Sequence, residues 1–431
     1  MARIFIYAMN YSPEAAGVGR YTGEIGDYFV AMGHEVIVLT TAPHYPGWKV
    51  LPPYRNGRYV RETRGGATIV RCPLILRERM GGIWRLIAPL SFALTSAPLA
   101  LWHVLRRRPD TVLCIEPTLM SAPVAVFAAW LVGAKTVLHV QDLEVDASFA
   151  VGHLAESPWL KRLAYGFERR ALRGFDRVIT ISARMTERLA AKGVPADRIA
   201  IVRNWVDLDH IKPLDGVSPY RKELGIGESD RVVLYSGNIG AKQGLDDLIA
   251  AAERLSGRAD IKFLIAGEGP AKKELVARAA HLPNVRFLPF QPYARLSEFL
   301  GLADIHILPQ AADAADLVLP SKLGGMLASG RRIVVTAAPG TELAIFLQDA
   351  AIVVPPANAA ALAEAIEQAV DAGPEDPAAA RGRRRLAEQL SKPGGLKDFE
   401  ALAVSWRSIS LGQDEAPGAP EAIAQHSEAA G

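Results

Sequence analysis

Short apolar runs alternate with helical stretches along most of this chain, and the alternation starts a second time near its middle. In the first half, five runs predict buried strands, at residues 4–9, 35–40, 111–115, 136–140 and 177–181. Helical patterns lie between some of them, at residues 21–32 and 159–172, and the first of these ends at Gly33. Because strands that alternate with helices pair in parallel, this half predicts a doubly wound sheet.

The second half repeats the pattern after a polar stretch around residues 204–219. Its expected strands lie at residues 231–236, 261–266, 333–335 and 352–354. Its expected helices lie at residues 245–255 and 359–369, with a charged helix that ends at about residue 390. The predicted fold class is therefore α/β, with two doubly wound, Rossmann-like domains that face a cleft.

The lapse in the pattern sets the expected domain boundaries. We place an acceptor-side domain at residues 1–208 and a nucleotide-binding domain at residues 209–390. We expect a C-terminal helix at residues 391–411 to pack back on the first domain. Residues 412–431 are rich in Ala, Gly, Pro, Glu and Ser, which predicts a disordered tail.

Composition favours a soluble enzyme. A chain of 431 residues is too long for one ordinary core and suits two α/β domains. The formal net charge is only +3 and no basic block is interleaved with aromatics, so nucleic acid is not an expected partner. Two cysteines, Cys72 and Cys114, indicate neither a disulfide framework nor a zinc site. The chain opens on a strand pattern without the features of a signal peptide, so we expect a cytoplasmic location.

Three segments of the second half suit phosphate binding, and each stands where a helix is expected to begin. The first runs from Gly237 to Gly244, the second contains Gly267 and Gly269, and the third is Leu319-Pro-Ser-Lys322. Helix amino ends present unpaired N–H groups, and glycine lets a phosphate approach the backbone. One such loop is weak evidence, but three in succession predict a nucleotide site.

Six segments together resemble the family 4 glycosyltransferases of the GT-B fold, and in particular their colanic-acid-type exopolysaccharide branch. They lie at residues 10–13, 43–48, 140–144, 203–207, 235–240 and 320–330. The resemblance covers about residues 4 to 400. It implies a nucleotide-diphosphate sugar in the carboxyl half and a saccharide acceptor in the amino half. It also implies a retaining transfer in the cleft, with no cofactor and no metal.

Donor chemistry needs groups that stabilise the departing nucleoside diphosphate, and preorganised amides and a cation serve that need. The expected amides belong to residues 237–240 and 321–323, and the expected cations are Lys242 and Lys322. At the next position, Gln243, many relatives carry a basic residue. The donor-binding candidates are Gly237, Asn238, Gly240, Lys242, Gln243, Gly267, Gly269, Ser321, Lys322 and Leu323.

Ribose recognition departs from the resembled family. Many members carry two glutamates separated by seven residues, which correspond here to Leu317 and Gly325. Neither position holds a carboxylate. Asp316 is adjacent and either substitutes for one or faces water as an ordinary loop residue.

On the acceptor side, Asp142 follows the strand at residues 136–140, at the edge of the sheet where ligands collect. Its carboxylate would orient or deprotonate an acceptor hydroxyl, or brace an oxocarbenium-like centre; the alternative is a helix cap. Gly17 and Gly19 are expected in a loop that admits a donor phosphate or an acceptor sugar, or in a turn that needs a positive φ. Glu24 is expected in the first helical turn, as a sugar contact or as a partner of the helix dipole.

A twenty-residue stretch without formal charge, residues 86–105, raises a membrane question. Two prolines and His103 argue against a span. Either a kinked helix lies on an anionic membrane surface with flanking arginines, or the helix packs in the core. The surface reading would suit a polyprenyl-diphosphate-linked acceptor, as in the resembled branch.

Readings from other classes share the alternating pattern. A dinucleotide-dependent oxidoreductase should show Gly-x-Gly-x-x-Gly after its first strand, and the segment from Gly17 to Gly23 is one residue too long. A non-catalytic sugar-nucleotide-binding subunit would account for the missing carboxylates. An epimerase of the same two-domain fold would need an acid/base pair within reach of the sugar.

Overall fold

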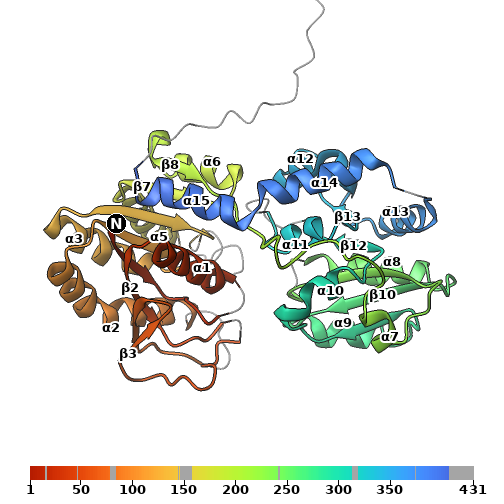
Figure 1. The fold of residues 1–431 in the computed structure, drawn as a ribbon, viewed down its shortest axis with the longest axis horizontal. Coiled ribbons are helices and arrows are strands. Elements are labelled where there is room, and N and C mark those ends of the chain that lie inside the picture. Colours follow the sequence, from red (N-terminus) through yellow and green to blue (C-terminus); the bar gives the residue numbers. More distant parts are fainter. Residues whose placement is uncertain are drawn as a thin grey trace, which may run out of the picture.

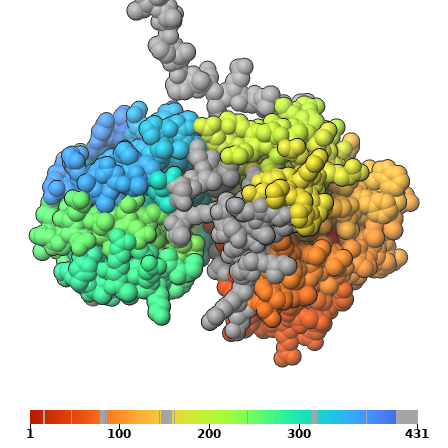
Figure 2. Space-filling model, turned by 180° about the vertical axis from the view of Figure 1, so that it is seen from behind, coloured from red at the N-terminus to blue at the C-terminus, as the bar shows by residue number. Residues whose placement is uncertain are grey.

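The computed structural model shows two α/β lobes side by side, the first coloured red to yellow-green and the second green to blue (Figures 1 and 2). The residues that it describes are 1–14, 17–45, 47–77, 84–143, 145, 158–240, 243–312, 319–373 and 375–406.

The amino-terminal lobe contains an eight-stranded sheet in the order β3-β4-β2-β1-β5-β6-β7-β8. Its strands are β1 (Arg3–Ala8), β2 (Glu35–Thr41), β3 (Val60–Arg64), β4 (Ala67–Cys72), β5 (Thr111–Glu116), β6 (Lys135–Val140), β7 (Arg177–Thr180) and β8 (Ile199–Ile201). All neighbouring strands pair in parallel except β3 and β4, which form an antiparallel hairpin at one edge that the apolar pattern did not predict. The described helices are α1 (Gly17–Ala31), α2 (Trp84–Arg107), α3 (Ala122–Val132), α5 (Pro158–Arg173) and α6 (Ala183–Ala191).

The carboxyl-terminal lobe contains a six-stranded, wholly parallel sheet in the order β11-β10-β9-β12-β13-β14. Its strands are β9 (Arg231–Ser236), β10 (Ile261–Ala266), β11 (Val285–Leu288), β12 (Ile305–Leu308), β13 (Arg332–Thr336) and β14 (Ile352–Val354). Its described helices are α7 (Tyr220–Leu224), α8 (Leu245–Arg254), α9 (Lys272–Arg278), α10 (Leu296–Leu300), α11 (Leu323–Ala328), α12 (Glu342–Leu347), α13 (Ala359–Asp371) and α14 (Pro377–Gln389). The predicted fold class, two doubly wound parallel sheets, is confirmed.

The chain returns to the first lobe at its end. Helix α15 (Lys392–Ala403) lies against α1, where the rings of Phe29 and Phe399 are 6.3 Å apart (Figure 1). Arg177, at the start of β7, donates a hydrogen bond to the carbonyl oxygen of Leu402. The last described helix therefore spans the junction between the two lobes.

Helix α2 covers the uncharged stretch that raised the membrane question. It buries Ala88, Phe92 and Ala100 in the core of the first lobe, whereas Leu94 and Trp102 on its other side are exposed. Among the described residues it is the one helix whose length and composition would let it cross a membrane, and half of its most apolar window is buried. The helix thus has both a packed face and an exposed apolar face.

Candidate active site

Lys322 stands at the carboxyl ends of the second sheet, immediately before α11. Its Nζ donates hydrogen bonds to Tyr235 Oη at 2.9 Å and to Gln243 Oε1 at 2.7 Å. It also lies 4.2 Å from the centre of the Tyr235 ring. Tyr235 is buried at the end of β9, and its hydroxyl donates to the carbonyl oxygen of Asn238 at 2.5 Å. The ammonium group is therefore held by neutral oxygens and a ring face.

Among the described residues, Lys322 has no ion-pair partner for its charge. The residue keeps some exposed surface, but loss of hydration around its ammonium group lowers its pKa to about 7 from an ordinary value of 10.5. An anion placed beside this nitrogen would restore the charged form.

Three of the expected phosphate amides are already bonded within the protein. The N–H groups of Gly237 and Ile239 donate to the carbonyl oxygens of Ala266 and Glu268, both at 2.9 Å. The amide of Leu323 donates to Pro320 at 2.9 Å. These three amides are therefore occupied: the loop after β10 pairs with the loop after β9 through the backbone, and Leu323 bonds within its own turn. A phosphate role for the amides of Asn238, Gly240 and Ser321 stays a prediction.

The glycines of these loops permit this close backbone approach. A Cβ on Gly267 would overlap the carbonyl oxygen of Gly237, and a Cβ on Gly269 would overlap the backbone of Ile239. Gly240 accepts a hydrogen bond from the amide of Gln243 at 3.1 Å. Gly267 and Gly269 therefore brace the loop that positions Lys322 and its partners.

A small interlobe crevice adjoins this region. Its walls come from Arg203 and Asn204 on one side and from residues 319–321 before α11 on the other, so the predicted residue Ser321 lines it. Asn204 exchanges two hydrogen bonds with Gln141, at 2.9 and 3.0 Å. The Gln141 side chain thus ties the end of β6 to the crevice, a role that sequence reasoning missed.

Asp142, the predicted acceptor-side carboxylate, follows Gln141 in an exposed turn after β6. The nearby His139 is fully buried, and burial lowers its pKa to about 3, which keeps the ring neutral. The predicted residue Lys242 lies outside the described residues, as do Asp316, Leu317 and the whole of residues 412–431.

The first helix begins earlier than expected, and this corrects three assignments. Because α1 starts at Gly17, Gly17 and Gly19 belong to its first turn and not to a loop before it. Glu24 lies a full turn further along than predicted. Its carboxylate accepts hydrogen bonds from Trp205 Nε1 at 2.5 Å and Arg20 Nε at 3.1 Å. Glu24 therefore anchors the segment between the lobes.

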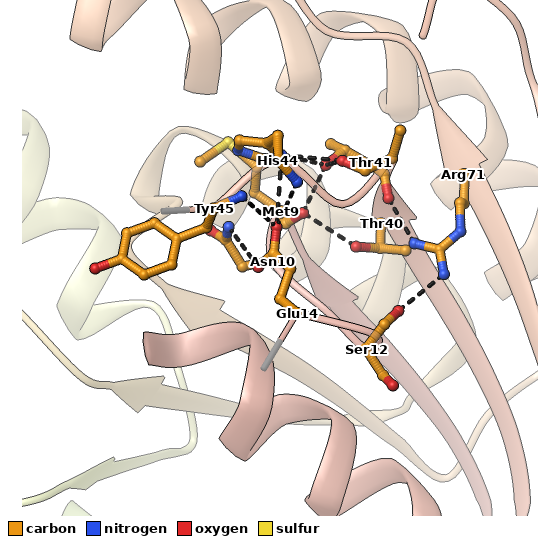
Figure 3. A network of polar contacts seen from close by, with 10 residues as sticks. Met9, Asn10, Ser12, Glu14, Thr40, Thr41, His44, Tyr45 and Arg71 are labelled. Carbon is orange, nitrogen blue, oxygen red and sulfur yellow. Dashed lines mark hydrogen bonds and ion pairs between the residues drawn. The ribbon is translucent and has the colours of Figure 1, made fainter. Parts of the chain in front are cut away.

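A buried polar network at the carboxyl ends of β1 and β2 was not predicted (Figure 3). Glu14 Oε1 accepts the backbone N–H groups of His44 and Tyr45 at 2.8 and 3.0 Å, and Glu14 Oε2 accepts from Asn10 Nδ2 at 3.0 Å. The available signal was that His44 falls in one segment that carries the family resemblance, residues 43–48, and that Glu14 directly follows another, residues 10–13. Among the described residues, no group of three or more His, Cys, Asp or Glu side chains is placed to hold a metal ion.

The lobes also contact each other directly. The carboxylate of Glu342, at the start of α12, accepts the N–H groups of Ala183 and Arg184 at 3.1 and 2.9 Å. It therefore caps the amino end of α6 from the other lobe. Arg20 of α1 lies 5.4 Å from the centre of the Tyr293 ring in the second lobe.

Comparisons with known proteins match each lobe to a glycosyltransferase domain. Residues 16–205 match the glycosyl transferase 4-like domain, and residues 217–386 match the glycosyl transferases group 1 domain. The colanic acid biosynthesis glycosyl transferase WcaI of Escherichia coli (strain K12) is 40% identical over 378 residues, which are 85% of this chain and 92% of that protein.

Two solved structures share the fold. The sucrose-phosphate synthase of Thermosynechococcus elongatus aligns with a TM-score of 0.68 at 17% identity, over 93% of this chain and 98% of that one. HepE of Anabaena, in complex with UDP-glucose, aligns with a TM-score of 0.68 at 16% identity, over 94% of this chain and 100% of that one.

Proposed function

Because this chain belongs to the glycosyltransferases, with a 4-like domain followed by a group 1 domain, we propose that it transfers a sugar from a nucleotide-diphosphate donor to a saccharide acceptor. The observation that carries the donor assignment is Lys322, a cation whose hydrogen-bond partners in the described part of the chain are Tyr235 and Gln243, at the carboxyl ends of the strands where ligands collect. The HepE complex with UDP-glucose supports a nucleotide sugar as the donor class.

The chemistry follows from the charge that develops during transfer. As the glycosidic bond of the donor breaks, the β-phosphate of the leaving nucleoside diphosphate gains negative charge. A preorganised cation stabilises that charge more strongly in the transition state than in the ground state. In this proposal Lys322 supplies that stabilisation without a metal ion, and its neutral partners keep the ammonium free to bind the phosphate.

The acceptor is proposed to lie against the amino-terminal lobe. Its hydroxyl attacks the anomeric carbon on the face that the phosphate leaves, the leaving phosphate takes the proton, and configuration is retained. Asp142, exposed after β6, is proposed to orient the acceptor hydroxyl. The similarity to WcaI supports a role in exopolysaccharide synthesis. We propose that the reaction takes place in the cytoplasm.

We further propose that the acceptor is lipid-linked and that the first lobe rests on the inner face of the membrane. Leu94 of α2 is 68% exposed and Trp130 of the neighbouring α3 is 73% exposed. Arg106 lies 5.9 Å from the ring centre of the exposed Trp102. Exposed apolar side chains beside arginines are typical of helices at an anionic interface.

The donor assignment is tested by thermal stabilisation with nucleoside diphosphates and nucleotide sugars, followed by transfer assays. A ligand that binds only the folded state stabilises it, by about 2.7 kcal/mol at a hundredfold excess over Kd. Transfer is measured to octyl glycosides and to a farnesyl-diphosphate-linked monosaccharide, together with slow donor hydrolysis in the absence of an acceptor. Stabilisation without either reaction would instead identify a sugar-nucleotide-binding subunit.

The membrane assignment is tested by cosedimentation with phosphatidylglycerol vesicles. We expect binding at low salt that weakens as salt is raised, and that is lost when Leu94→Glu places a charge on the exposed face. Ile345→Glu, on an exposed site of α12 in the other lobe, is the matched control. Equal binding by wild type and Leu94→Glu would contradict the proposal.

A further inference from the structure

Glu14 fixes a short peptide of the amino-terminal lobe. One of its carboxylate oxygens accepts the consecutive N–H groups of His44 and Tyr45, and the other accepts from Asn10 (Figure 3). Glu14 is only 3% exposed, so these bonds are made away from water. A buried carboxylate that is hydrogen-bonded in this way holds its neighbours in one position.

His44 is the neighbour with unused bonding capacity. Its Nδ1 lies 3.0 Å from the carbonyl oxygen of Ala42, which only accepts hydrogen bonds, so Nδ1 carries the proton. In the neutral ring Nε2 then holds a lone pair. The residue is fully buried, and Nε2 has no hydrogen-bond partner among the described residues.

The backbone next to His44 is strained. The imidazole packs against Trp48, with ring centres 5.6 Å apart. Trp48 has a φ of +53°, in the left-handed region that a bulky side chain rarely adopts. Strained residues of this kind are concentrated at binding and catalytic sites. The strain and the unpartnered nitrogen are independent observations at the same place.

This place lies on the side of the lobe that faces the cleft. A Cβ on Gly17 would lie 2.7 Å from Cε1 of Tyr45, so Tyr45 packs directly on the amino end of α1. One turn further along α1, Arg20 reaches the Tyr293 ring of the other lobe. The ring of Tyr45 points away from the Glu14 network (Figure 3).

We propose that His44 is an acceptor-binding residue, whose Nε2 accepts a hydrogen bond from a hydroxyl of the acceptor saccharide, and that Glu14 is its positioning residue. This inference rests on the proposed transfer function. A neutral polyhydroxylated ligand suits the site, because the network already satisfies its one carboxylate and leaves the Nε2 atom of His44 without a partner among the described residues. The indole of Trp48 has to move aside when the hydroxyl enters.

The test compares His44→Phe, which keeps a ring and removes the acceptor nitrogen, with His44→Gln, which keeps an acceptor atom. We expect His44→Phe to raise KM for the best of the octyl glycoside or farnesyl-diphosphate-linked acceptors by about tenfold or more, with partial recovery in His44→Gln. Donor hydrolysis and the thermal shift with nucleoside diphosphate should not change. An unchanged acceptor KM in His44→Phe, or an equal loss of donor hydrolysis, would overturn the inference.

His103→Phe is the matched control for packing effects. His103 is also buried, with one ring nitrogen that has no partner among the described residues. It lies on α2 near Arg3 and Glu35, at the amino ends of the strands, whereas His44 lies near their carboxyl ends. We expect this variant to leave the acceptor KM unchanged. Donor hydrolysis by the wild type tests the proposed function without any acceptor, so its failure is distinct from a failure of the His44 assignment.

The role of Glu14 is tested by exchanging the carboxylate of Glu14 and the amide of Asn10 between the two positions. Glu14→Gln sets an amide NH₂ against the amide NH₂ of Asn10, so we expect the acceptor KM to rise. Adding Asn10→Asp restores a donor–acceptor pair and should recover most of the loss. A double variant no better than Glu14→Gln would remove Glu14 as the positioning residue.

Discussion

Each lobe carries a charged side chain on the side that faces the cleft, a lysine in one lobe and a glutamate in the other. The two side chains differ in how their charges are hydrogen-bonded. In the carboxyl-terminal lobe, the Lys322 ammonium is held by two neutral oxygens and no described carboxylate. In the amino-terminal lobe, the Glu14 carboxylate accepts three N–H groups and is completely enclosed by them.

The difference indicates what the cleft-facing side of each lobe binds. A buried charge without a counter-ion is unfavourable, so it persists where a ligand supplies the opposite charge. A carboxylate that is fully hydrogen-bonded fixes local geometry and attracts no further ligand. The cleft-facing side of the carboxyl-terminal lobe therefore suits a diphosphate. The cleft-facing side of the amino-terminal lobe suits the hydroxyl groups of a neutral sugar.

The substitution with the largest expected effect is at Lys322, and it tests the contrast between the two lobes. We expect Lys322→Met to lower kcat/KM for the donor by about a hundredfold or more, because the variant loses the cation that stabilises the leaving diphosphate. Steady-state kinetics at varied donor concentration, and thermal shifts with nucleoside diphosphate, measure this loss.

The control is Lys262→Met. Lys262 is near the start of β10, at the amino ends of the strands, whereas Lys322 lies at their carboxyl ends. The Nζ of Lys262 donates to the Ala259 carbonyl oxygen. We expect this variant to bind the donor normally. If the two lysine variants behave alike, general electrostatics and not a phosphate site explains the effect, and the contrast between the lobes fails.

Nine of the parallel strands could be predicted because a strand buried on both faces is a continuous apolar run. The parallel strands β4, β8, β11 and β12 were not predicted. Strands β9 and β10 match the expected residues, and β1 differs by one residue at each end. The hairpin strand β3 was missed because most of its side chains are exposed or half-exposed and carry no apolar run. It pairs in antiparallel fashion at the edge of the sheet, where sequence patterns are weakest.

The position of Lys322 was predictable from a Pro-Ser-Lys segment ahead of a helical pattern, but the partners of its ammonium group were not. Tyr235 and Gln243 precede Lys322 by 87 and 79 residues. The backbone pairing that occupies the amides of Gly237 and Ile239 has no side-chain signature, since it depends on how the loops after β9 and β10 meet. The role of Glu14 could not be predicted for the same reason, because two of its partners are backbone amides about thirty residues away.

Gly17→Ala sharpens the comparison from the amino-terminal side. Gly17 has a φ of +62°, and an added Cβ would also press on the Tyr45 ring. We expect left-handed strain of about 1–2 kcal/mol plus a further overpacking term of about 1–3 kcal/mol. Gly33→Ala is the control, because Gly33 has a φ of +82° and open space around its Cβ position. Chemical denaturation should show the larger loss for Gly17→Ala, together with a raised acceptor KM; equal losses would mean that Tyr45 is not held there.

Lys322 should also produce two opposite pH dependences. The pKa of Lys322 is lowered to about 7, so above that pH the unfolded chain binds more protons than the folded protein. The contribution of Lys322 to the free energy of unfolding should therefore rise between about pH 7 and its ordinary pKa of 10.5. Affinity for a nucleoside diphosphate should fall over the same range, because the neutral amine no longer attracts the phosphate.

The two slopes separate a phosphate ligand from a merely buried lysine. The second ionisation of a phosphate is nearly complete above about pH 7, so measurements from there upward report the protein group. The fall in affinity is limited to about tenfold per pH unit. Isothermal titration at each pH, with denaturation of the free protein, measures both quantities, and both slopes should vanish in Lys322→Met. If stability rises with pH while affinity stays constant, Lys322 titrates without touching the diphosphate, and the assignment of different ligands to the two lobes loses its basis.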